Sequence, residues 1–124
     1  DKVLVVRDAD TKSLNQVRNR MEEKVRGRSY PFPLKLCVIK EEMETWLLAD
    51  EKAISKAVGK DIPRVNEDLE SVEKPKERLT QILSQAKVSY TPKVARRIAA
   101  AADPDRIEYR CPGFREFRES VLAC

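Results

Sequence analysis

The chain has 124 residues, 41% hydrophobic and 37% charged, and its 25 Lys and Arg against 21 Asp and Glu give a formal net charge of +4. This size and composition predict one folded domain over residues 1–124. The absence of histidine excludes Ser-His, Cys-His and histidine-zinc sites, and three glycines are too few for a P-loop or a dinucleotide fingerprint.

A strand-helix-strand unit is predicted at the start of the chain. The β-branched run at residues 3–6 is typical of a strand buried on both faces of a parallel sheet. An amphipathic helix over 12–26 and a second strand over 34–39 follow. Because the crossover makes the two strands parallel, both end at the same edge of the sheet.

The rest of the chain reads mainly as helix. We expect a short helix with Met43, Trp46 and Leu47 on its apolar face, a loop over 60–76, and a weak edge strand at 107–111. Three further helices are expected, around 79–86, from Thr91-Pro92 onward, and from Phe114 to Val121. The predicted fold is therefore α/β, a small parallel sheet with flanking helices and a helical C-terminal half.

A sheet of two strands is marginal by itself. The chain begins with Asp1 and enters a strand at once. We therefore expect a further strand, either N-terminal to this chain or supplied by a partner. The exposed edges of so small a sheet also make a homodimer or a partner protein an expected form of assembly.

Acidic residues follow both predicted strands. Asp8 and Asp10 come after the first strand, and a cluster containing Glu42 and Glu44 comes after the second. Carboxylates at the shared carboxyl edge are suitable ligands for Mg²⁺, which then polarises a phosphodiester or activates water. We predict Asp8, Asp10 and Glu42 as catalytic residues and these three with Glu44 as metal ligands, although spacing does not decide which glutamate reaches the metal. In the alternative interpretation Asp10 is an N-cap for a helix that starts near Thr11.

Basic residues lie on both sides of the acidic stretch. Residues 41–70 contain nine acidic and four basic side chains, whereas residues 71–97 contain seven basic and two acidic ones. The predicted phosphate-binding residues are Lys74, Lys76, Lys93, Arg96 and Arg97. The last three share a helix face by their spacing, which suits a phosphate backbone. The alternative is a solvated helix face with no ligand.

A resemblance to a known family is carried by five blocks that cover nearly the whole chain: "VLVVRDAD", "KEEMETWLLAD", "KPKERL", "YTPKVARRIA" and "CPGFREF". The chain resembles a family of small bacterial and archaeal proteins described as a domain of unknown function and related to TOPRIM (topoisomerase-primase) and RloB-like proteins. The resemblance implies a TOPRIM-like core in which Asp8 and Asp10 bind magnesium. The separate catalytic glutamate of that fold follows an earlier strand, which has no counterpart in this chain.

Two functions remain open. The first is a magnesium-dependent enzyme on nucleic-acid phosphodiesters, a nuclease acting in genome defence. The second is a non-catalytic module that binds nucleic acid or a protein, with Asp8 and Asp10 in structural roles. A small-molecule phosphate enzyme is less attractive, because the chain has no glycine-rich loop to cradle a nucleotide. Three cysteines without a CxxC pair and no membrane-length apolar run indicate a cytoplasmic protein with no membrane partner.

Overall fold

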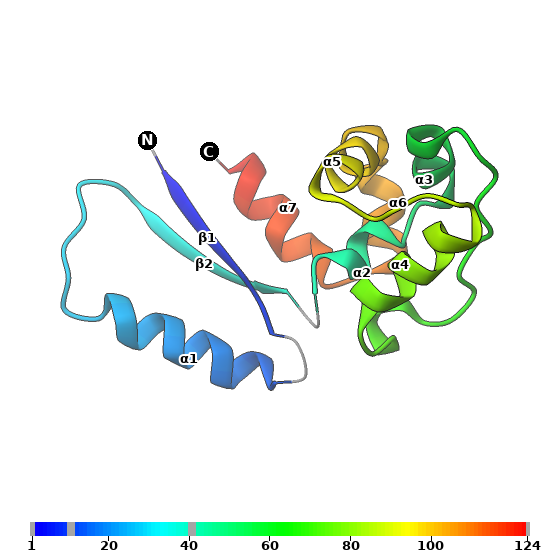
Figure 1. The fold of residues 1–124 in the computed structure, drawn as a ribbon. Helices are drawn as coiled ribbons and strands as arrows, with labels where there is room; N and C mark the ends of the chain where they lie inside the picture. The colour runs from blue at the N-terminus through cyan, green and yellow to red at the C-terminus, as the bar shows by residue number, and fades with distance from the viewer. Residues whose placement is uncertain (1, 10–11, 40–41, 124) are drawn as a thin grey trace.

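The computed structural model describes residues 2–9, 12–39 and 42–123. Strand β1 (Val3–Asp8), helix α1 (Leu14–Val25) and strand β2 (Leu34–Ile39) form the predicted unit, and the two strands pair in parallel (Figure 1). In this register Asp8 lies opposite Ile39, so both strands end at one edge of the sheet. Most of the remaining helices gather beyond that edge, whereas the C-terminal helix lies alongside the strands (Figure 1).

The prediction that the first strand is buried on both faces is wrong. Val3 and Val5 are 37% and 39% exposed, and burial alternates along β1. The reason is the position of α1, which packs on β2 through Val17 and Met21, in one apolar cluster with Val38. Among the described residues, this leaves the Val3 and Val5 face of β1 without a covering helix.

Helix α1 begins later than a capping role for Asp10 requires. The N-cap position is Ser13 and the first helical residue is Leu14, not a residue near Thr11. The N-cap is therefore Ser13, and the interpretation of Asp10 as the N-cap is wrong. Asp10 itself lies outside the described residues. The predicted helix over 12–26 is otherwise confirmed.

The C-terminal half is helical, as predicted, and builds the larger core. Its elements are α2 (Glu44–Leu47), α3 (Glu51–Val58), the 3-10 turn η1 (Leu69–Ser71), α4 (Pro75–Gln85), α5 (Pro92–Ala101), α6 (Pro104–Arg110) and α7 (Phe114–Leu122). Leu79, Leu83 and Ile98 are completely buried between these helices. Ile39 and Val6 extend the same core to the sheet.

Local capping signals explain where helices α5 and α6 start. Thr91 accepts a hydrogen bond from the Val94 N–H at 3.2 Å and Pro92 occupies the first turn, which confirms the predicted start of α5. Residues 107–111 are not an edge strand, because α6 runs from Pro104 to Arg110. Asp103 accepts from the Asp105 N–H at 3.0 Å, and this cap with the following proline outweighs the alternating pattern.

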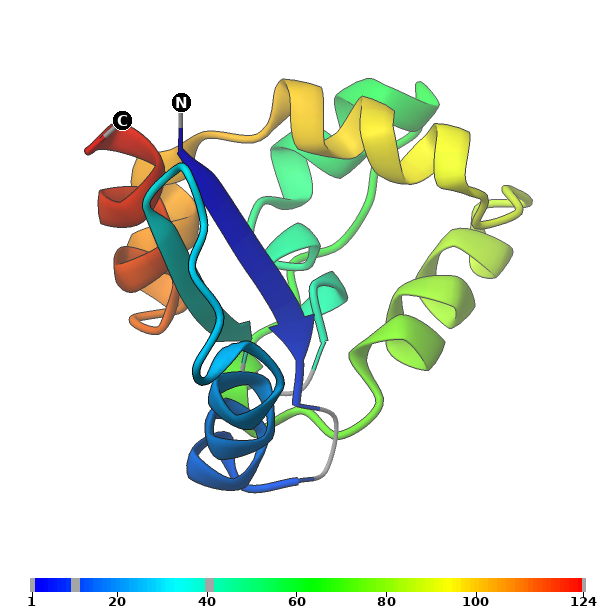
Figure 2. The ribbon, with the colours of Figure 1, turned by 90° about the vertical axis from the view of Figure 1, so that its left-hand side faces the viewer.

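Helix α7 lies against the sheet on the side away from α1, beside both chain ends (Figures 1 and 2). The Phe114 ring meets Trp46 edge to face, with centroids 4.9 Å apart, and Phe117 completes the cluster. Trp46 is therefore a core residue, as its place on the predicted apolar helix face indicates. The Lys2 ammonium donates to the Ser120 carbonyl and holds β1 to α7.

Two cysteines are buried free thiols. Cys37 is 1% exposed in β2 and Cys111 is 0% exposed at the end of α6. Burial raises the pKa of both thiols, that of Cys111 to about 12.

In the described part of the chain, no helix has the length and apolar character that crossing a membrane requires.

The thiols of Cys37 and Cys111 are expected to be unreactive in the native protein. The thiolate is the reactive form, which the raised pKa disfavours, and burial keeps a thiol reagent from reaching the sulfur atoms. In a Cys124→Ser variant at pH 8, we expect a chromogenic disulfide reagent to label neither Cys37 nor Cys111 during the time in which free glutathione reacts completely. Both thiols should react in guanidinium chloride. Rapid labelling of the native variant would contradict the burial of Cys37 and Cys111.

Candidate functional site

The acidic edge is built around Asp8. Its Oδ1 accepts a hydrogen bond from the Met43 N–H at 3.1 Å. Because Met43 stands between Glu42 and Glu44, this contact brings the carboxylate of the first strand to the chain segment that carries the second acidic cluster. The topology therefore places Asp8 beside that segment, whereas Asp10 and Glu41 lie outside the described residues.

The two glutamates reach in different directions. Glu42 Oε1 accepts from the Lys76 N–H in the first turn of α4, at 3.1 Å. Glu44 Oε1 accepts from the Tyr90 hydroxyl at 3.2 Å. Glu42 lies before helix α2, whereas Glu44 is the first residue of that helix, so the two side chains start from different parts of the backbone. Glu42 thus joins the segment after β2 to helix α4, and Glu44 joins the same segment to Tyr90, which precedes helix α5.

A magnesium site remains a prediction. Within the described ranges, no group of three or more Asp, Glu, Cys or His side chains is arranged to hold a metal ion. Magnesium commonly takes one or two protein carboxylates and completes its shell with water and substrate phosphates. The donor chemistry of Asp8 and Glu42 fits that pattern, because carboxylate oxygens are ligands that Mg²⁺ prefers in proteins.

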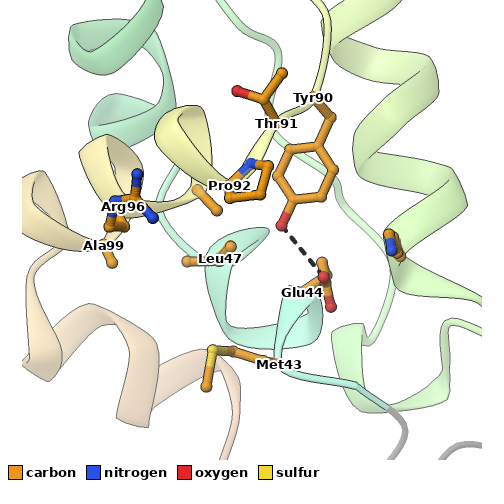
Figure 3. A pocket seen from close by; sticks show the side chains of 10 residues that line it. Met43, Glu44, Leu47, Tyr90, Thr91, Pro92, Arg96 and Ala99 are labelled. Atoms are coloured by element: carbon orange, nitrogen blue, oxygen red, sulfur yellow. Dashed lines mark hydrogen bonds between the residues drawn. The ribbon is translucent and has the colours of Figure 1, made fainter.

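A pocket of about 400 Å³ opens next to this edge, between α2, α4 and α5. In Figure 3 the Tyr90 hydroxyl points toward Glu44, with Met43 and Leu47 on one wall and Arg96 and Ala99 on α5. Its lining residues are Met43, Glu44, Leu47, Lys76, Tyr90, Thr91, Pro92, Ala95, Arg96 and Ala99. The pocket is mainly apolar, with a carboxylate, a phenol and two cations among its groups.

Two of the predicted phosphate-binding residues line this pocket. Lys76 comes from α4 and Arg96 from α5, so residues 20 positions apart contribute charge to one cavity. Lys76 belongs to the first turn of α4, which corrects the prediction that it lies in a loop. Lys93 and Arg97 are exposed on α5, and Lys74 is exposed just before α4.

The phenol of Tyr90 acts as a hydrogen-bond donor. Burial is the largest cause that raises the pKa of Tyr90 far above its ordinary value, and the neighbouring Glu44 carboxylate is the second. The hydroxyl therefore stays protonated and donates to Glu44. This pair is the polar centre of the pocket, and sequence analysis missed it because the two residues are 46 positions apart.

Asp50 is the second residue whose role sequence analysis missed. It is 4% exposed, its Oδ1 accepts from the Ala53 N–H at 3.1 Å, and its Oδ2 accepts from the Asp103 N–H at 3.0 Å. Asp50 thereby caps α3 and anchors the start of α6. An Asp before a helix-forming stretch was the available signal for the cap.

A known family model covers nearly the whole chain. Residues 1–122 match a family model described as "Domain of unknown function (DUF4276)". No curated protein and no solved structure matches the chain.

Proposed function

Because the chain belongs to the DUF4276 family, whose description assigns no activity, we propose its function from the site: a magnesium-dependent enzyme, nuclease-like, acting on nucleic-acid phosphodiesters. A TOPRIM-like core related to RloB-like proteins and a role in genome defence are part of this proposal. They rest on the resemblance of the sequence blocks described above.

The observation that carries the proposal is the hydrogen bond from the Met43 N–H to Asp8. It brings the acid at the end of β1 to the segment with Glu42 and Glu44, at the carboxyl edge of a parallel sheet, where α/β proteins bind ligands. Asp8 and Glu42, with Asp10 as predicted, would hold magnesium. The bound metal would polarise the phosphodiester and lower the pKa of an attacking water.

The basic residues would position the substrate. Arg96 offers a planar fork of donors that matches two phosphate oxygens, and Lys76 offers a mobile point charge. Their common pocket lies next to the acidic edge, because Met43 and Glu44 belong to both. Lys74, Lys93 and Arg97 would extend the phosphate contacts along the surface on either side.

Metal binding tests the assignment of Asp8. Asp8→Asn keeps an oxygen that accepts from Met43 but removes the charge, so the fold is retained while a ligand is lost. We expect Mn²⁺ affinity, measured by electron paramagnetic resonance, to fall at least about tenfold in Asp8→Asn. The exposed Asp61→Asn is the matched control and should bind Mn²⁺ like the parent chain.

The same proteins should be assayed for Mg²⁺-dependent cleavage of labelled DNA and RNA. Cleavage by the parent chain that is lost in Asp8→Asn and kept in Asp61→Asn supports the enzyme. Unchanged Mn²⁺ affinity in a folded Asp8→Asn protein would remove Asp8 from the site.

A second candidate is a non-catalytic module that binds nucleic acid or a partner protein. It is favoured by the fact that Asp8, Glu42 and Glu44 each already accept a hydrogen bond that fixes the local fold. In this role the carboxylates are structural and the cations carry the binding. Salt-sensitive binding of DNA or RNA that is unchanged by EDTA, without cleavage, would select the module over the enzyme.

A further inference from the structure

We propose that the pocket between α2, α4 and α5 is a nucleotide site that takes a guanine base inward and its phosphate at Lys76 and Arg96. The inference rests on the proposed function in taking nucleic acid as the ligand, and it names which part of that ligand the pocket recognises. It requires no metal, so it can be tested separately.

The walls of the pocket suit the faces of a base. Leu47, Pro92, Ala95 and Ala99 give it apolar sides, and its volume of about 400 Å³ falls in the range of small-molecule sites. Met43, also on the wall, is 45% exposed, which leaves a large flexible apolar side chain at the site without full cover. A planar base would cover this surface and use the polarizable sulfur as a contact.

The polar centre selects the edge of the base. Glu44 can only accept hydrogen bonds, and with Tyr90 donating to one oxygen it retains lone pairs for a ligand. Guanine presents two adjacent donors, N1–H and the 2-amino group, that a carboxylate can accept together. Hypoxanthine lacks the amino group, and adenine places an acceptor at N1. We therefore expect the order of affinity GMP, then IMP, then AMP.

The charges fix the orientation of the nucleotide. A phosphate next to Glu44 would be repelled, so the base must be the part that approaches the carboxylate. Lys76 and Arg96 lie on different helices of the lining, and the ion pairs of the described residues involve neither of them. Both cations are thus available to the phosphate while the base occupies the apolar part.

Filling the pocket provides the main test. Ala99 lines the pocket and is exposed on α5, and its neighbour Ala100 is also exposed but does not line it. Ala99→Trp should therefore block the site without disturbing the core, and Ala100→Trp is the matched control. With EDTA present, we expect calorimetric titration to show GMP binding that falls at least about tenfold in Ala99→Trp and is retained in Ala100→Trp.

Further probes separate base recognition from simple anion binding. Ribose 5-phosphate should bind much more weakly than GMP, and Glu44→Gln should lose the preference for GMP over IMP. No GMP binding at millimolar concentration, equal binding of ribose 5-phosphate and GMP, or equal GMP binding by the two tryptophan variants would overturn the proposal. Asp8→Asn should bind GMP like the parent chain, so failure of the metal site and failure of the nucleotide site give different results.

Discussion

Replacing Phe114 by alanine is expected to lower the free energy of unfolding by about 4 kcal/mol. Phe114 is 8% exposed and meets Trp46 edge to face, with ring centroids 4.9 Å apart and planes at 82°. Truncation removes the buried ring and leaves a cavity at the junction of α7 and α2. Because this junction lies between the sheet and the helical half, neighbouring side chains cannot easily close the gap.

Phe114→Leu is the matched control for this variant. Leucine keeps most of the apolar volume but loses the aromatic contact, so we expect a cost of about 1–1.5 kcal/mol. Urea unfolding followed by circular dichroism gives both values. A cost for Phe114→Ala no larger than that of Phe114→Leu would show that the aromatic cluster is not an important part of the core.

Asp50→Ala is expected to cost about 3 kcal/mol of stability. The substitution removes the cap from α3 and leaves the Asp103 N–H without its carboxylate acceptor. It also removes the charge that faces Arg106, whose Nε lies 3.8 Å from Asp50 Oδ1. Arg106 retains its ion pair with Glu51, which limits the loss.

The control for Asp50 is Asp103→Ala. Asp103 is an exposed helix cap that accepts from the Asp105 N–H at 3.0 Å, so its loss should cost about 1 kcal/mol. Asp50→Asn, which keeps one acceptor oxygen, should fall between the two alanine variants. Thermal unfolding with matched urea titrations measures the three proteins. Equal costs for Asp50→Ala and Asp103→Ala would mean that burial adds nothing to the role of Asp50.

The sequence predicts those parts of the fold that follow local rules. Helical spacing of Val17 and Met21 places α1, and the Thr91-Pro92 pair places the start of α5. The burial of β1 could not be read in the same way. Whether Val3 and Val5 are covered depends on where α1 packs. The apolar run at residues 3–6 does not indicate that position.

The candidate site is predictable to a similar degree. Parallel strands place Asp8 near the segment after β2, and this follows from topology alone. The pairing of Glu44 with Tyr90 depends on the packing of α2 beside α4 and α5, for which the sequence has no local signal. The same packing brings Lys76 and Arg96 to one pocket although they belong to separate helices.

The position of α7 has a consequence for how the native protein opens. The helix packs on β2 with one part of its surface and contacts Trp46 of α2 through Phe114 and Phe117. Detachment of α7 would expose apolar surface of the sheet and of the helical half together. We therefore expect the backbone amides of the sheet and of the helical half to belong to one cooperative unit, because detachment of α7 removes packing from both.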